Sequence, residues 1–167
     1  MKKIFLDQIV LDGYDDKYKD YINDFKEGKS FSKYIHNIKE RIELTKYKEE
    51  FSLECGYIVL NKNLIPIGYV FLSNIKRDEI YVEYSVLNNE RRKGYGKLIL
   101  SEVSDFLAQN YNIKQINLDI DPSNEASIKT AESCGFTFDE ESFENNNYMG
   151  KMLFYKENIF YIKKSKR

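Results

Sequence analysis

Three cations beside two glycines form the most chemically suggestive stretch of the sequence. Arg91, Arg92 and Lys93 precede Gly94 and Gly96 in the run RRKGYG, and an amphipathic segment follows directly. Glycines leave backbone N–H groups unshielded, and a helix start directs its unpaired N–H groups and the positive end of its dipole outward. Together with the three cations, these groups predict a pocket for an anion such as phosphate.

The spacing of this turn differs from two common phosphate-binding motifs. A P-loop ends in Lys-Ser or Lys-Thr after a fixed glycine spacing, which RRKGYG does not have. The dinucleotide fingerprint requires a third glycine and follows a first strand, whereas GYG comes late in this chain. A glycine-rich turn with a solvated basic cluster stays open as the purely structural alternative.

A second segment with possible chemistry lies further along the chain. The run DIDPSNEASIKTAESCGF, residues 119–136, has the pattern of a strand end, a short helix led by Asn124 and a closing glycine. Asparagine at a helix N-cap accepts a hydrogen bond from the first turn. Gly135 suits the left-handed residue that commonly ends a helix. Ser127 falls in the first turn of this predicted helix.

Apolar periodicity predicts the elements that position these two segments. Residues 79–87 alternate as a strand does and lead into the glycine turn. After the turn, apolar residues recur as on a helix packed against a sheet: Ile99, Leu100, Val103, Phe106 and Leu107. Residues 115–120 are predicted to be a strand again. Strand, helix and strand at this spacing predict a βαβ unit with parallel strands.

The N-terminal part predicts an antiparallel meander with helices. Residues 3–11 are apolar enough for a first strand, and 15–25 and 33–47 have the composition of amphipathic helices. The apolar runs 52–60 and 65–73 are joined by Asn-Lys-Asn, as in a β-hairpin. We therefore expect an α/β fold with a mixed sheet, an antiparallel meander followed by the parallel unit. Two further runs predict closing strands, 136–138 and 148–155.

Composition narrows the class of protein. The chain has 167 residues, 42% hydrophobic and 32% charged, which suits a single soluble domain over residues 1–167. A net charge of −1 argues against a dedicated nucleic-acid binder. Cys55 and Cys134 are isolated, which predicts no metal site and a cytoplasmic location. We expect no membrane segment, a solvated basic tail at 163–167, and a monomer or homodimer.

The two segments together resemble the GNAT family of acyl-CoA-dependent N-acyltransferases over roughly residues 56–136. The family's first motif, Gln/Arg-x-x-Gly-x-Gly/Ala, is matched by Arg91, Gly94 and Gly96. Its second motif is an Asn, a Ser or Ala three residues later and a Gly-Phe at the helix end, matched by Asn124, Ser127 and Gly135-Phe136. The family's fold, with two splayed parallel strands, is implied with it.

The resemblance implies that the anion is the pyrophosphate of coenzyme A and that acetyl-CoA is the co-substrate, with no metal. The pantetheine arm would lie between the splayed strands, along the backbone of Val86, and Asn124 would fix it near the thioester. Cations of the turn would balance the phosphate charge. The implied cofactor-binding residues are Val86, Arg91, Arg92, Lys93, Gly94, Tyr95, Gly96, Lys97 and Asn124.

The implied reaction is direct attack of a primary amine on the acetyl thioester. Many family members place a general-acid tyrosine four residues before the helix glycine, where this chain has Ala131. A small residue there is similar to the branch that acetylates ribosomal-protein N-termini, in which the helix serine protonates the thiolate; Ser127 matches it. A first-turn serine that bonds its own backbone is the alternative. Glu83 is the candidate base, or else a solvated strand carboxylate.

The acceptor is the least determined part of the site. The favoured acceptor is a peptide or protein N-terminus, and a polyamine or aminoglycoside is the second candidate. Acidic residues at 15–16 and 139–144 hint at a cationic acceptor. The missing helix tyrosine keeps a non-catalytic acyl-CoA-binding module as the competing class. His36, the only histidine, is not expected to be catalytic. Three tyrosines are predicted to pack in the sheet, namely Tyr57, Tyr69 and Tyr84.

Overall fold

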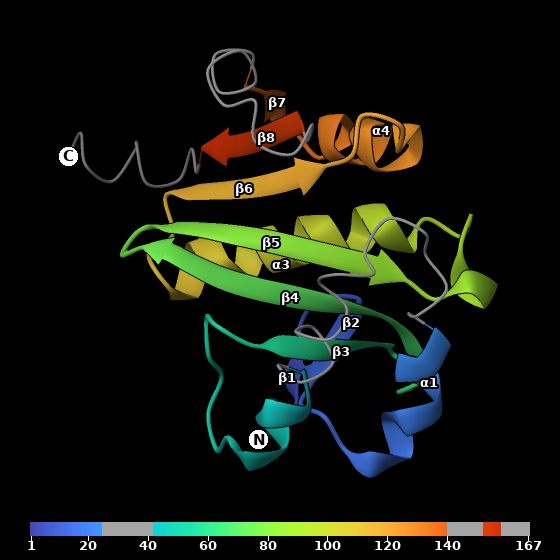
Figure 1. Ribbon diagram of the computed structural model, residues 1–167. Helices are drawn as coiled ribbons and strands as arrows, with labels where there is room; N and C mark the ends of the chain where they lie inside the picture. Colours follow the sequence, from blue (N-terminus) through green and yellow to red (C-terminus); the bar gives the residue numbers. More distant parts are fainter. Residues whose placement is uncertain (25–41, 140–151, 158–167) are drawn as a thin grey trace.

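One mixed sheet organises the computed structural model, which describes residues 1–24, 42–139 and 152–157 (Figure 1). Within these residues the sheet has eight strands in the order β1-β2-β3-β4-β5-β6-β8-β7. The strands are β1 (Ile4–Phe5), β2 (Ile9–Asp12), β3 (Gly56–Asn61), β4 (Pro66–Lys76), β5 (Glu79–Val86), β6 (Gln115–Ile120), β7 (Thr137–Phe138) and β8 (Met152–Glu157).

Two regular helices lie close to the predicted site. Helix α3 (Tyr95–Asn110) lies behind β5 in the view of Figure 1, and α4 (Glu125–Ser133) follows β6. The remaining helical segments are η1 (Asp16–Tyr18), α1 (Lys19–Asp24), η3 (Leu44–Tyr47) and η4 (Asn88–Glu90). In the part of the chain that the structure describes, no helix is both long and apolar enough to cross a membrane.

Apolar side chains cover both faces of the sheet. On one face they form what we call the α3 core, in which Ile80 and Val82 of β5 belong to the same cluster as Ile99 and Leu100 of α3. On the opposite face, residues of β2, β3 and β4 pack with residues of α1 and of the segments next to it, and we call this cluster the α1 core. Its members are Val10, Tyr14, Tyr18, Ile22, Ile42, Ile58, Leu60, Tyr69 and Phe71.

The strand pairing confirms the predicted fold class. Strands β1 to β5 pair antiparallel in chain order, and β5 then pairs parallel with β6. In the β5–β6 register, Glu79 pairs with Gln115, Ile80 with Ile116 and Tyr81 with Asn117. Strand β5 continues to Val86 beyond this ladder. The two parallel strands are therefore splayed, as the family resemblance implies.

The prediction of one strand over 3–11 is wrong. The structure has two antiparallel strands there, β1 and β2, with Ile4 opposite Leu11. A tight turn joins them, in which the Leu6 N–H donates to the Ile9 carbonyl over 2.9 Å. The polar pair Asp7-Gln8 sits in that turn. The apolar residues on either side therefore face each other across a short hairpin.

The hairpin predicted from 52–60 and 65–73 is confirmed as β3 and β4, with a later start. Asn61 Oδ1 accepts from the N–H groups of Asn63 and Ile65 at 2.9 and 3.1 Å, which closes the connection. The first strand begins at Gly56 because the preceding residues turn. The Tyr57 hydroxyl fixes that turn through the N–H and the carbonyl of Ser52, at 2.6 and 2.8 Å.

The predicted helix over 15–25 is observed as η1 and α1, and Asp15 caps it by accepting from the Lys17 N–H at 3.0 Å. Of the predicted helix over 33–47, residues 42–47 are helical, whereas 33–41, including His36, lie outside the described residues. The closing strands correspond to β7 and β8 in their described parts. Residues 140–144 and the basic tail also lie outside the described part.

We predict that Gly68→Ala lowers the free energy of unfolding by about 1–3 kcal/mol, the usual cost of overpacking. Gly68 lies opposite Val86 at the end of β5, and a Cβ there would meet the Ser85 carbonyl oxygen at 2.2 Å. Urea unfolding measures the loss. Gly13→Ala is the matched control, because its Cβ would meet the Thr45 carbonyl oxygen at 3.4 Å. Equal stabilities of the two variants would contradict the close approach of β4 and β5.

Candidate active site

The glycine turn connects the end of β5 to the start of α3 through two left-handed residues. Arg92 has φ of +63° and Gly94 has φ of +83°. Gly94 is the N-cap of α3 and has no side chain with which to cap the first turn. The N–H groups of the first helical residues, which have no intrahelical acceptor, are thus unshielded. A Cβ built on Gly94 would meet nothing within 4 Å, so the turn faces open space.

The cations of the turn are exposed, but two of them already have protein partners. Arg91 Nε donates to the Val86 carbonyl over 3.3 Å. Lys93 Nζ pairs with Glu90 Oε2 at 2.9 Å. Arg92 and Lys97 are exposed as well. The turn therefore combines unshielded N–H groups with side-chain charge, which is the arrangement that binds an anion at a helix start.

The edge of β5 that faces β6 leaves the ladder after Tyr81. Five residues of β5, from Val82 to Val86, continue beyond the last parallel pair. Backbone N–H and C=O groups on such an edge can pair with an extended ligand in the way that an added strand does. The Arg91 side chain reaches the carbonyl at the far end of this edge. The glycine turn and the open edge are thus continuous along the chain.

Helix α4 begins and ends as the sequence predicts. Asn124 is its N-cap, and Asn124 Oδ1 accepts from the Ser127 N–H at 3.2 Å. At the other end Gly135 has φ of +82°, and the Phe136 N–H donates to the Ala131 carbonyl at 3.0 Å. Ala131 is fully buried in the α3 core. The position at which many members of the resembled family carry a tyrosine is a core position in this chain.

Tyr84 of β5 reaches the inward side of α4. A Cβ built on Gly96 would lie 3.5 Å from the Tyr84 ring and 3.9 Å from the Thr130 methyl group. Burial raises the pKa of Tyr84 above the ordinary phenol value, and the side chains of Thr130 and Ser127 partly offset this rise. Sequence reasoning assigned Tyr84 to sheet packing alone. The ring does pack on the α3 core, beside Gly96 of α3 and Thr130 of α4.

Glu83 lies on the face of β5 opposite to Tyr84, because successive strand residues alternate. It is in register with Phe71, a member of the α1 core, and its Oε1 atom is buried. The pKa of Tyr69 is raised by burial and further by the charge of Glu83. The two predicted catalytic side chains therefore belong to opposite sides of the sheet. Glu83 of β5 points to the α1 side, whereas Ser127 of α4 lies on the α3 side.

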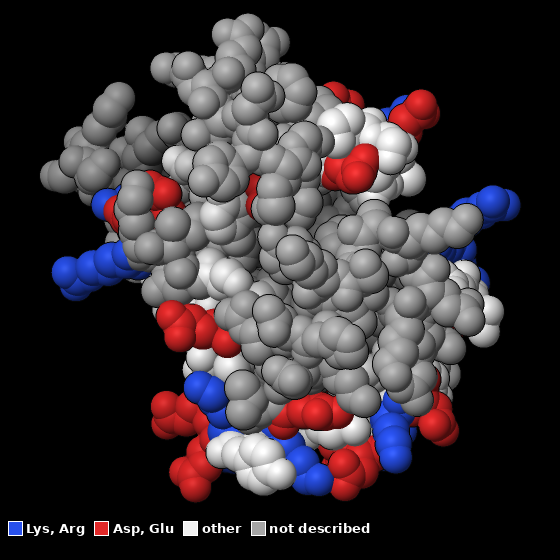
Figure 2. Space-filling model, viewed as in Figure 1, with Lys and Arg blue, Asp and Glu red and all other residues white. Residues whose placement is uncertain are grey.

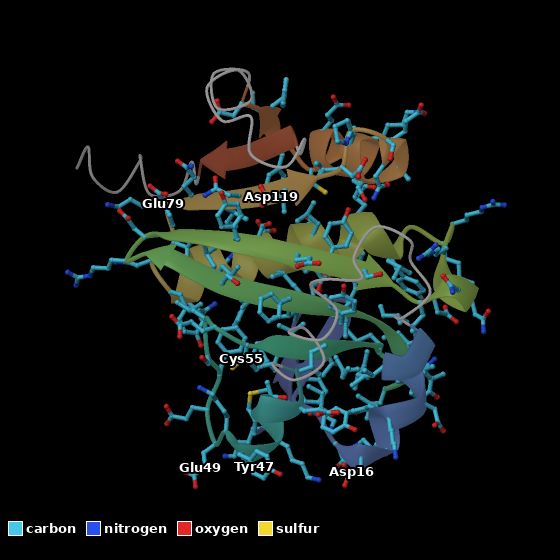
Figure 3. The ribbon with its side chains drawn as sticks, in the orientation of Figure 1. Asp16, Tyr47, Glu49, Cys55, Glu79 and Asp119 are labelled. Carbon is cyan, nitrogen blue, oxygen red and sulfur yellow. The ribbon has the colours of Figure 1, made fainter. Side chains whose placement is uncertain are left out.

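Acidic residues flank Tyr81 on the same face of β5 as Glu83. Burial raises the pKa of Tyr81, and the negative charges of Asp119 and Glu79 raise it further. Figure 3 shows Glu79 and Asp119 on the neighbouring strands β5 and β6. Carboxylates grouped on this face create a negative potential that attracts ammonium groups.

The acidic pair 15–16 is placed differently. Asp16 lies at the lower edge of the molecule in Figure 3 and forms an ion pair with Lys46 at 2.7 Å. Acidic and basic side chains are mixed along this edge (Figure 2). The ion pair offsets the charge of Asp16, so this residue adds little to the attraction of a cationic acceptor.

Neither cysteine belongs to a metal cluster among the described residues, where no group of three or more His, Cys, Asp or Glu could hold an ion. Cys55 is buried in the α3 core. Cys134 is half-buried at the end of α4, and its Sγ lies 3.6 Å from the Lys97 carbonyl. This contact links the end of α4 to the first turn of α3.

Comparison with known proteins begins with a family profile. The profile described as "Acetyltransferase (GNAT) domain" matches residues 14–137. The match starts well before residue 56, so the family likeness includes the segment around α1 that the motifs did not reach. No curated protein matches the chain in sequence.

Solved structures share the fold at low identity. A spermidine N-acetyltransferase SpeG chimera from Vibrio cholerae and hSSAT has a TM-score of 0.72 at 18% identity, over 93% of this chain and 99% of that chain. RimL, described as a ribosomal L7/L12 alpha-N-protein acetyltransferase in complex with coenzyme A, has a TM-score of 0.70 at 14% identity, over 93% and 98%. A putative ribosomal-protein-serine acetyltransferase from Vibrio cholerae has a TM-score of 0.68 at 14% identity, over 93% and 97%.

We predict that Gly94→Ala lowers the free energy of unfolding by about 1–2 kcal/mol, because an L-residue with a side chain pays that cost at a left-handed φ. Gly94→Asn should lose less, since asparagine tolerates this conformation. Urea unfolding of both variants measures the difference. Gly96→Ala serves as control, because its Cβ would make an ordinary contact of 3.5 Å with the Tyr84 ring. Equal losses for alanine and asparagine at 94 would show that φ is not the cause.

Proposed function

The chain belongs to the GNAT acetyltransferase family, and from this membership we propose that it transfers the acetyl group of acetyl-CoA to a primary amine within a ternary complex. The leading acceptor is a peptide or protein N-terminus, and a polyamine or aminoglycoside comes next. We further propose that residues 1–167 act as one cytoplasmic domain, monomeric or homodimeric, that needs no metal or nucleic acid.

One observation carries the proposal: the left-handed glycine turn lies directly beyond the open edge of β5. Residues 91–97 would hold the diphosphate through the N–H groups at the start of α3. The edge from Val82 to Val86 would pair with the pantetheine arm, for which Arg91 must release the Val86 carbonyl. Asn124, at the start of α4, would lie toward the acyl end. Acetyl-CoA supplies the thioester whose carbonyl carbon the amine attacks.

The proton balance assigns roles to the two candidate catalytic residues. The amine nitrogen forms a bond to the acyl carbon, the carbon–sulfur bond breaks, and the sulfur leaves with its electron pair. Glu83 would accept the amine proton, directly or through water. Ser127 would donate its proton to the departing sulfur, whose pKa as a free thiol is about 8.5. Solvent would then return a proton to Ser127 and remove the proton from Glu83. In the net reaction one proton moves from the amine to the thiol.

The cost of deprotonating the acceptor favours an α-amine. A lysine-like amine with a pKa of about 10.4 costs roughly 4.6 kcal/mol to deprotonate at pH 7, whereas an α-amine with a pKa of about 7.7 costs about 1 kcal/mol. The carboxylates of Glu79, Glu83 and Asp119 would attract either kind of ammonium group. The fold similarity to RimL supports the first acceptor class, and that to a spermidine N-acetyltransferase supports the second.

We predict that the protein releases coenzyme A thiol from acetyl-CoA when a peptide with a free N-terminus is present. The same peptide with its N-terminus blocked should give background release, and spermidine less release than the free peptide. A thiol-reactive dye follows the reaction. Release with spermidine alone would reassign the acceptor to the small amines. Thermal stabilisation by acetyl-CoA without acceptor-dependent thiol would favour the non-catalytic acyl-CoA-binding module instead.

We also predict that Arg91→Ala weakens coenzyme A binding by about 1–3 kcal/mol, the scale of one charge-assisted contact. Isothermal titration calorimetry measures the affinity. Arg77→Ala is the matched control, because Arg77 is exposed in the turn between β4 and β5, at the other end of β5. Both variants change the net charge equally. An affinity of Arg91→Ala equal to that of Arg77→Ala would remove Arg91 from the cofactor site.

A further inference from the structure

We propose that Glu90 limits how tightly the protein holds coenzyme A, because its carboxylate keeps Lys93 in an ion pair that the diphosphate of the ligand must displace. This inference rests on the proposed function, since it concerns the anion site of the same cofactor. Glu90 is not part of the motif that the glycine turn matches, and it brings a negative charge next to a site for anions.

The position of Glu90 is fixed by the segment between the open edge of β5 and the glycine turn. Glu90 ends η4, and its N–H donates to the Leu87 carbonyl over 2.8 Å. The next N–H, that of Arg91, donates to the Asn88 carbonyl over 3.4 Å. The carboxylate is therefore carried by a hydrogen-bonded turn of backbone, shortly before the N-cap of α3 at Gly94.

Lys93 is the ion-pair partner of that carboxylate. Its Nζ lies 2.9 Å from Oε2 of Glu90, and the Glu90 side chain is 22% exposed whereas that of Lys93 is 53% exposed. Lys93 stands between the two left-handed residues Arg92 and Gly94, directly before the helix start. The lysine is thus the freer member of the pair, and rotation of its flexible stem can move the ammonium group from Glu90 toward an anion at that helix start.

Two effects make this exchange unfavourable for the ligand. The exposed ion pair breaks when Lys93 turns to a phosphate, which is a modest loss. Glu90 then remains as an unpaired negative charge near a diphosphate, and like charges repel. Because these effects oppose binding, Glu90 lowers the affinity that the backbone N–H groups and the cations of the turn would otherwise give.

A limit on affinity serves turnover. Coenzyme A carries the same diphosphate as acetyl-CoA, and the proposed reaction leaves that group unchanged. Tighter binding there would hold product and substrate alike and would add nothing to the chemical step. Glu90 thus favours the release of the product coenzyme A, a step that limits many enzymes.

Glu90→Gln tests the inference, since glutamine has the same shape and no charge. The variant should bind coenzyme A about threefold to tenfold more tightly than the wild type in isothermal titration calorimetry, because the ion pair is weakened and the repulsion is removed. A gain in affinity cannot arise from partial unfolding. The gain should shrink at high salt, which screens exposed charges. Unchanged affinity, weaker binding or a gain that salt leaves intact would overturn the inference.

Asp78→Asn is the matched control. Asp78 forms an ion pair with Lys114 at the same 2.9 Å, and it directly precedes β5, at the end of that strand far from the glycine turn. The length of β5 exceeds the Debye length at physiological salt. Asp78→Asn changes the net charge as Glu90→Gln does, and its affinity for coenzyme A should equal that of the wild type. An equal gain in both variants would overturn the role of Glu90.

A Lys93→Ala background separates the exchange from simple repulsion. In this background Glu90→Gln should raise the affinity less than it does in the wild type, because no ion pair remains to be broken. Equal gains in the two backgrounds would overturn the exchange of Lys93. Dephospho-coenzyme A keeps the diphosphate and lacks the phosphate on the ribose, so it should bind Glu90→Gln with the same gain as coenzyme A. Loss of that gain would overturn the assignment of Lys93 to the diphosphate.

The two levels of proposal fail differently. A wild-type protein that binds no coenzyme A overturns the proposed function, and the role of Glu90 falls with it. A wild-type protein that binds coenzyme A, with a Glu90→Gln variant that binds it no more tightly, overturns the role of Glu90 alone.

Discussion

The hydrogen-bond ladder between β5 and β6 ends after the Tyr81–Asn117 pair, and the candidate site depends on this early end. Unpaired backbone groups on a strand are costly unless water or a ligand satisfies them. Packing maintains the separation: the Tyr84 ring lies against α4 and the start of α3, while Gly68 brings the end of β5 close to β4. The core of the sheet thus holds open the edge that the proposed cofactor would occupy.

The glycine turn is the second part of the candidate site. It offers backbone N–H groups to a ligand, more than side-chain charge. Arg91 and Lys93 have partners in the protein and must exchange them to meet a ligand. The N–H groups at the start of α3 are fixed by the helix itself and cost no rearrangement. Gly94, with its left-handed φ and open surroundings, lets those groups face outward. In the proposed site the cations would strengthen the binding of an anion whose position the backbone N–H groups determine.

Local patterns in the sequence account for much of this arrangement, and contacts between distant segments account for the rest. The alternation in 79–87, the helical spacing of α3 and the cap at Asn124 are each encoded within a few residues, so they could be predicted. The turn at Asp7-Gln8 is too short to interrupt the apolar pattern, which is why 3–11 looked like one strand. Tyr84 and Thr130 come together beside Gly96 only through the packing of β5, α3 and α4, and no local pattern carries that information.

The placement of Glu83 and Ser127 on opposite faces of β5 constrains the proposed reaction. A base on the α1 side and a donor on the α3 side can serve one acyl group only if that group lies near the plane of the sheet. The gap beyond Tyr81 is where the plane is interrupted between β5 and β6. The amine would then approach from the face that carries Glu79, Glu83 and Asp119, and the thiolate would depart toward α4. In the proposed reaction the splay would separate the two proton transfers in space, so that accepting the amine proton would not compete with donation to sulfur.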